Sequence, residues 1–131
     1  GKAEVIFNED ALELYDTNYV LEGWTDATTI GKEAVATLGW NVSSVQKSKI
    51  LNSNCERLVF IPDIGKYDEA VKLAADFIDY KKEVLVVDLR NIDREEKEDD
   101  ANSIGRLRIM EEVEKTKPLD FLAATMLMMA V

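Results

Sequence analysis

Two short, continuously apolar runs separated by an amphipathic stretch constrain the fold of this chain more than any other feature. Residues 58–61 and 84–87 contain no polar side chain, as in strands that are buried on both faces of a parallel sheet. Between them, apolar residues recur at intervals of three and four over residues 66–80, which predicts a helix with one buried face. Because parallel neighbours need a crossover that a helix supplies, the pattern predicts an α/β fold.

The rest of the sequence continues this alternation. We expect strands at residues 19–21 and 36–38, and helices at residues 24–35, 42–51, 104–113 and about 118–131. The predicted architecture is a mostly parallel, four-stranded central sheet flanked by helices, in one domain that spans residues 1–131. The last helix is rich in methionine, and we expect it to join the core or to pack on a neighbouring domain.

The composition limits the chemistry that the chain can perform. Its 131 residues include no histidine and a single cysteine, Cys55, which excludes an internal disulfide, the usual zinc site and a nucleophile activated by imidazole. No run approaches the roughly 18 apolar residues of a membrane span, and the N-terminus does not resemble a signal peptide. We therefore expect a cytoplasmic protein with no membrane partner.

The net charge of the chain is −10, from 26 acidic and 16 basic residues. This is the wrong sign for holding nucleic acid through counterion release alone. A nucleic-acid partner would therefore be bound through metal ions or through another domain. Equally, the acidic surface can serve only to keep the protein soluble.

Acidic residues follow three of the predicted strands. Glu22 comes after the first strand, Asp63 after the third and Asp88 after the fourth. Asp99 and Asp100 close the loop that follows. Parallel strands bring such residues to one edge of the sheet, where open α/β sheets bind their ligands. Hard oxygen ligands without histidine suit Mg²⁺ or Mn²⁺, so the pattern favours a divalent-metal site.

Several of these acids also have a purely structural interpretation. Asp26 and Asp68 lie near predicted helix starts, where a negative charge is favourable in itself. Asp100 precedes the next helix and fits an N-cap. The acidic run at residues 93–100 has the composition of a solvated loop. From the residues alone, both interpretations stay open.

Five segments, in this order, resemble the Toprim domain shared by primases, topoisomerases and related nucleases. They are residues 19–27 (YVLEGWTDA), 34–39 (AVATLG), 58–63 (LVFIPD), 98–102 (EDDAN) and 117–122 (KPLDFL). The second and fifth resemble DnaG-type primases, and the fourth is similar to the Lys-Asp-Ala-Asn element of phage primases. Together they favour the primase branch and imply the Rossmann-like Toprim fold.

The resemblance also implies a function and residue roles. It implies a nucleotidyltransferase that makes RNA primers as part of a larger primase or primase-helicase, and that is weak or inactive in isolation. Glu22 would be the general acid or base, or a metal ligand, while Asp63 and Asp100 would hold Mg²⁺ or Mn²⁺. Asp26 and Asp99 are further candidates. Nucleic acid and nucleoside triphosphates would be bound through the metal ions.

One position departs from the family pattern. Gly65 stands where the second aspartate of an Asp-x-Asp motif is expected, so a metal ligand is missing. Either Asp68 or Asp88 compensates, or the site binds a single metal, or activity has been lost. Two alternative functions therefore stay open. One is a non-catalytic Toprim module that binds a nucleotide, a metal or a partner protein, and the other is a Toprim-type nuclease.

Overall fold

The computed structural model describes residues 4–80 and 82–129 of the chain. Its elements, in chain order, are α1 (Ala11–Leu14), β1 (Thr17–Leu21), α2 (Trp24–Ile30), β2 (Ala34–Ala36), α3 (Ser44–Leu51), β3 (Arg57–Phe60), α4 (Tyr67–Ile78), β4 (Glu83–Val86), the 3₁₀ helix η2 (Leu89–Asn91), α5 (Ala101–Ile104), α6 (Arg106–Lys115) and α7 (Phe121–Met129). The strands form one sheet in the order β2-β1-β3-β4, and all neighbours in it are parallel. The predicted α/β class with a four-stranded sheet is confirmed, and the arrangement is consistent with a Rossmann-like Toprim fold.

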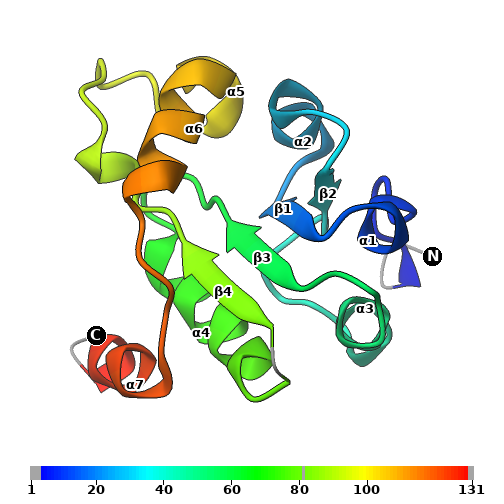
Figure 1. Cartoon of the computed structure of the whole chain (residues 1–131). Coiled ribbons are helices and arrows are strands. Elements are labelled where there is room, and N and C mark those ends of the chain that lie inside the picture. The colour runs from blue at the N-terminus through cyan, green and yellow to red at the C-terminus, as the bar shows by residue number, and fades with distance from the viewer. Residues whose placement is uncertain (1–3, 81, 130–131) are drawn as a thin grey trace.

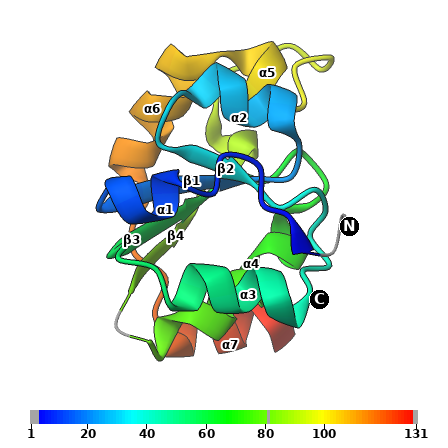
Figure 2. The same cartoon turned by 90° about the vertical axis from the view of Figure 1, so that its right-hand side faces the viewer.

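Helices cover both faces of the sheet and give three layers. Figure 1 and Figure 2 show α2, α5 and α6 on one face and α3, α4 and α7 on the other. The β3-α4-β4 unit is the strand-helix-strand unit that the two apolar runs predicted, because β3 and β4 pair directly in parallel. This arrangement leaves the carboxyl ends of the strands free of a covering strand, so the loops there can form a site.

The core lies in two layers, one on each face of the sheet. In β3, Leu58 and Phe60 pack with the layer of α3 and α4, whereas Val59 and the residue that follows the strand, Ile61, pack with the layer of α2, α5 and α6. This alternation is the period of two that a strand imposes. Phe60 also lies against Phe77 of α4, with 6.0 Å between the ring centroids. The strands are thus buried on both faces, which is why their sequences are continuously apolar.

The prediction of a helix over residues 24–35 is wrong in its second half. α2 ends at Ile30, because Gly31 adopts a φ of 129°, a conformation that L-residues avoid, while its N–H bonds to the Ala27 carbonyl. The second strand lies at Ala34–Ala36, earlier than the predicted residues 36–38, and its three residues are buried beside β1. Alanine favours helix in isolation, but pairing and burial next to β1 override that preference.

The helical tail is interrupted twice. Gly105 separates α5 from α6, and α7 begins at Phe121, where the Asp120 carboxylate accepts the Ala123 N–H (2.6 Å). Residues 130–131 of the predicted last helix lie outside the described residues. α7 lies along α4 (Figure 1), with Ala124 buried and Leu122 exposed. Within the described ranges, the structure has no helix that is both long enough and apolar enough to cross a membrane.

Candidate functional site

Three of the predicted site residues follow strands that end at the same edge of the sheet. The register pairs the last residues of β3 with those of β1 and β4, so the three strands end level with one another. Glu22 follows β1 directly, Asp63 follows β3 and Asp88 follows β4. The structure therefore brings the backbone of these acids to one side of the sheet, which is the placement that parallel pairing requires.

The loop that ends the acidic run brings two further acids to this edge. The Asp99 carbonyl accepts the Ile64 N–H (2.8 Å), which ties the loop to the residue that follows Asp63. Asp100 is the N-cap of α5, and its Oδ1 accepts the Ser103 N–H (2.7 Å). The Ser103 hydroxyl accepts the Asp100 N–H in return (3.2 Å), completing a capping box. The predicted N-cap role of Asp100 is therefore confirmed. The capping hydrogen bond fixes the Asp100 carboxylate, whose charge acts on Asp63.

Asp26 joins the two helices that carry the edge acids. It lies in the first turn of α2, is buried, and accepts the Asn102 N–H of α5 through Oδ1 (2.8 Å). Thr29 adds a second link, because its hydroxyl donates to the Asn102 side-chain oxygen (2.9 Å). Figure 2 shows α2 and α5 side by side on the same face of the sheet. Asp26 is thus more than a helix-start charge: it holds the start of α5, and with it Asp100, next to β1.

Five carboxyl groups interact electrostatically at this edge, which we call the acidic edge: Glu22, Asp26, Asp63, Asp99 and Asp100. Burial, together with the charges of the other four acids, raises the pKa of Asp63 from its ordinary value of 3.8 to about 7. Burial likewise raises the pKa of Asp26, partly offset by its hydrogen bond from Asn102. Crowded carboxylates in a partly desolvated position are the setting that a cation stabilises most.

Asp88 and Asp68 belong to a different group of charges. Asp88 caps η2 and forms a two-pronged ion pair with Arg90, with 2.9 Å and 2.8 Å between the guanidinium nitrogens and the carboxylate oxygens. This hydrogen bonding lowers the pKa of Asp88. Arg90 also lies over the Tyr67 ring, 5.3 Å from its centroid. Asp68 is exposed in the first turn of α4, next to this group.

Gly65, at the position of the missing ligand, is required by a turn. The Lys66 N–H bonds to the Asp63 carbonyl (3.0 Å), and Gly65 has a φ of 90° at the third position of this four-residue turn. A type II turn needs a positive φ there, which glycine adopts without strain. A second aspartate at this position would therefore strain the turn, although an added Cβ would meet no atom within 4 Å.

Two arginines shape the acidic loop, and sequence reasoning missed both. Arg108 of α6 forms an ion pair with Glu98 and donates to the Ile104 carbonyl (2.8 Å). Its hydrogen bonds to Glu98 lower the pKa of that carboxyl to about 2. Arg94 donates to carbonyl oxygens of the loop, including that of Glu98 (3.3 Å). Basic residues within and after an acidic run are the sequence signal that such a loop is folded rather than merely solvated.

The donor set of the acidic edge fits Mg²⁺ or Mn²⁺, because it consists of carboxylate oxygens alone. Within residues 4–80 and 82–129, however, no three Asp, Glu, His or Cys side chains are arranged closely enough to hold a metal ion by themselves. Mg²⁺ does not need such a cage, since it keeps several waters and is usually held by one or two carboxylates together with substrate phosphates. Asp63, Asp100 and Glu22 are the side chains that would hold it.

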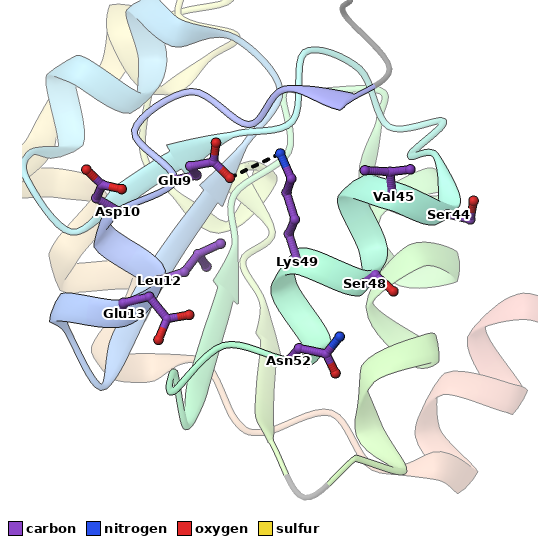
Figure 3. Close-up of a pocket in the computed structure, with 9 residues that line it drawn as sticks. All are labelled: Glu9, Asp10, Leu12, Glu13, Ser44, Val45, Ser48, Lys49 and Asn52. Carbon is purple, nitrogen blue, oxygen red and sulfur yellow. Dashed lines mark ion pairs between the residues drawn. The ribbon is translucent and has the colours of Figure 1, made fainter.

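The clearest hollow of the surface lies elsewhere. It is a groove between α1 and α3, shown in Figure 3, and Glu9, Glu13, Val45 and Lys49 are among its lining residues. Lys49 crosses the groove to form an ion pair with Glu9 (3.2 Å). None of the predicted site residues lines it. The groove and the acidic edge are therefore separate parts of the surface.

No known family model matches the chain, and no curated protein matches it. Its fold is similar to that of a solved structure, the zinc-binding and RNA polymerase domains of the Aquifex aeolicus primase. The TM-score is 0.65 at 17% sequence identity, over 91% of this chain and 31% of that one. The chain thus spans about a third of the length of that primase chain. At this identity, the likeness establishes the fold.

Proposed function

We propose that the chain is the Toprim-type catalytic domain of a DNA primase, which joins nucleotides with the help of Mg²⁺ or Mn²⁺ held at the acidic edge. The observation that carries the proposal is the convergence of five carboxyl groups where β1 and β3 end, with the pKa of Asp63 raised to about 7. The fold likeness to a primase over nearly the whole chain supports the choice of reaction.

The residues have distinct roles in this proposal. Bound Mg²⁺ would neutralise the charge of a triphosphate and make the attacking hydroxyl easier to deprotonate. Asp63 and Asp100 would hold the ion, and Glu22 would accept or donate a proton or add a third ligand. Asp26 keeps α5 in place through Asn102. The remaining parts of a larger protein would supply the basic surface for the template, because this chain carries a net charge of −10.

The test is primer synthesis by the full-length protein that contains this chain. Glu22→Gln removes the ionisable group but keeps its size, and we expect primer synthesis to fall by about 10²–10⁴-fold, the usual contribution of a general acid or base. Glu83→Gln is the control, since Glu83 lies at the opposite end of the strands. Metal titration of both variants separates a lost ligand from a lost proton-transfer group.

Gly65 favours a second candidate, a non-catalytic module that binds metal and nucleotide. The turn at Asp63–Lys66 leaves no unstrained place for a second aspartate, so the edge has fewer ligands than the family pattern. Primer synthesis that is indifferent to Glu22→Gln, together with retained Mg²⁺ binding, would select this candidate over the enzyme.

A further inference from the structure

Trp24 is a large aromatic residue that is exposed at the start of α2, two residues after Glu22 of the acidic edge. Its exposed fraction is 58%, although it is the first residue of α2 and follows Glu22-Gly23 directly. The buried face of α2 is formed by Asp26, Ala27 and Ile30. Since residues of a helix are 100° apart, Trp24 lies on a different face from Asp26. The fold therefore does not use the indole as a core residue.

The indole ring also has no aromatic or cationic partner among the described residues. The ring pairs in that part of the chain are Trp40–Phe60 and Phe60–Phe77, and the cation contacts are Lys32 with Tyr15 and Arg90 with Tyr67. Within the described ranges, therefore, no aromatic ring or cation is stacked on Trp24. Thr25 and Thr28, on the same helix, are exposed as well.

The position of Trp24 relative to Glu22 sets the size of the group that can bridge them. The Cα atoms of Glu22 and Trp24 are at most about 7 Å apart, because two residues of chain span no more than that. A nucleotide bound beside Glu22 is therefore long enough to reach the start of α2. A nucleotide whose phosphates are held by metal at Asp63 and Asp100 has its base at the other end. Stacking involves no net charge, so the five acids that repel phosphates do not oppose it.

We propose that Trp24 is the platform on which a nucleobase stacks when its phosphates are bound at the acidic edge. The inference rests on the proposed function, because it needs the phosphates to be there. Stacking one base on an aromatic ring contributes roughly 5- to 150-fold in affinity when measured by alanine substitution, and it tolerates any base. Trp24 would thus supply sequence-independent affinity that the negatively charged chain lacks.

The two tryptophans of the chain give a direct test by NMR. Trp24 is exposed whereas Trp40 is 7% exposed in the core, so one indole N–H signal reports on the platform and the other serves as an internal reference. The chain is titrated, in Mg²⁺, with ATP, with inorganic tripolyphosphate and with a short oligothymidylate. We expect the Trp24 indole to shift with ATP and not with tripolyphosphate, while the amides of Glu22 and Asp63 shift with both. The oligothymidylate shows whether a single strand uses the same platform.

Variants make the test quantitative. Trp24→Ala should weaken ATP binding by about 10-fold while leaving tripolyphosphate binding unchanged, and Trp24→Phe should retain part of the affinity. Tyr80→Ala is the matched control, because Tyr80 is also 58% exposed but lies after the far end of α4.

Two experimental outcomes distinguish a failure of the stacking proposal from a failure of the proposed function. Equal ATP affinity of Trp24→Ala and the unchanged chain, with the amides of the acidic edge still responding to Mg²⁺ and phosphates, would overturn the platform alone. Amides of the acidic edge that respond to no metal, phosphate or nucleotide would overturn the proposed function and the platform with it.

Discussion

Asp63 and Asp88 follow neighbouring strands at the same edge of the sheet, yet their carboxyl groups behave in opposite ways. Burial and four surrounding acids raise the pKa of Asp63 to about 7, whereas the Arg90 guanidinium lowers the pKa of Asp88. The charged groups that most affect Asp63 are all acids, whereas Asp88 has its counter-ion two residues away. The position of an acidic residue at a strand end therefore makes it a candidate for a metal site. The charges around its carboxyl group decide whether that group needs an external cation.

Of the effects that distinguish these two acids, the largest is on activity. Asp63→Asn in the full-length protein should reduce primer synthesis by at least about 10- to 100-fold, because the loss of even an outer-shell partner of a metal costs that much and we assign Asp63 as a ligand. Asp88→Asn should leave it within a few-fold, since Asp88 is already bound to Arg90. The measurement is the initial rate of primer synthesis at several Mg²⁺ concentrations. Equal losses for both variants would show that the two acids form one site.

The second effect is the pH dependence of stability, which should have opposite signs for the two acids. Asp63 binds its proton more tightly in the folded state, so its contribution to stability falls as the pH rises from about 4 to about 7. Asp88 binds its proton less tightly when folded, so its contribution is present above pH 3.8 and is lost on further acidification.

Urea denaturation at pH 5 and pH 8 measures this difference. After allowance for solvent screening, Asp63→Asn should raise the free energy of unfolding at pH 8 by about 1–2 kcal/mol relative to its effect at pH 5. Asp76→Asn, on the exposed face of α4, is the control for the loss of a carboxylate away from the acidic edge. A pH profile that Asp63→Asn does not alter would mean that the carboxyl group is not crowded.

The sequence was sufficient to predict which acidic residues lie at this edge of the sheet. It was not sufficient to predict the hydrogen bonds and ion pairs that their carboxyl groups form. Strand ends and the five resembling segments located Glu22, Asp63 and Asp100. The hydrogen bond from Asn102 to Asp26 joins residues that are far apart in the chain, and no local pattern encodes it. The Asp88–Arg90 pair was visible in the sequence as neighbouring opposite charges, and that signal could have set Asp88 apart.

The third effect concerns the turn between Asp63 and α4. Gly65→Asp places a Cβ on a residue with a φ of 90°, so we expect a loss of about 1 kcal/mol or more in the free energy of unfolding. Gly65→Asn is the matched control, because it carries the same strain without the charge. The two variants are compared by thermal denaturation and by Mg²⁺ titration. If Gly65→Asp is as stable as the unchanged chain, the turn does not require glycine.

The smallest expected effect comes from the residues that hold the acidic loop. Arg108→Gln removes the ion pair to Glu98 and should loosen residues 93–100, lowering Mg²⁺ affinity by a few-fold. Lys97→Gln is the control: it also removes one positive charge, from the loop itself, but loses only an exposed pair with Glu95 (3.4 Å). Hydrogen exchange of the loop amides measures the loosening. Identical exchange in both variants would show that Arg108 does not order the loop.

Long-range packing also explains where the fold departed from the sequence. The apolar runs of β3 and β4 are sufficient to predict their structure, because apolar side chains on both faces of a strand are buried only in the centre of a covered sheet. Ala34–Ala36 carries no such signal, since alanine on its own favours helix, and the pairing of this segment with β1 decides its state. The 4-residue α1 is likewise formed by local turns that no periodicity reveals.

The claim that the acidic edge is a divalent-cation site can be tested by adding Mn²⁺ in small amounts to the ¹⁵N-labelled chain. Paramagnetic Mn²⁺ broadens the amide signals nearest to it. We expect the amides of Glu22, Asp63 and Asp100 to broaden first, those of Asp88 and Arg90 later, and Asp63→Asn to abolish the preference. Broadening that begins at Glu9 and Glu13 in the groove of Figure 3, or that is uniform over all acids, would contradict the claim.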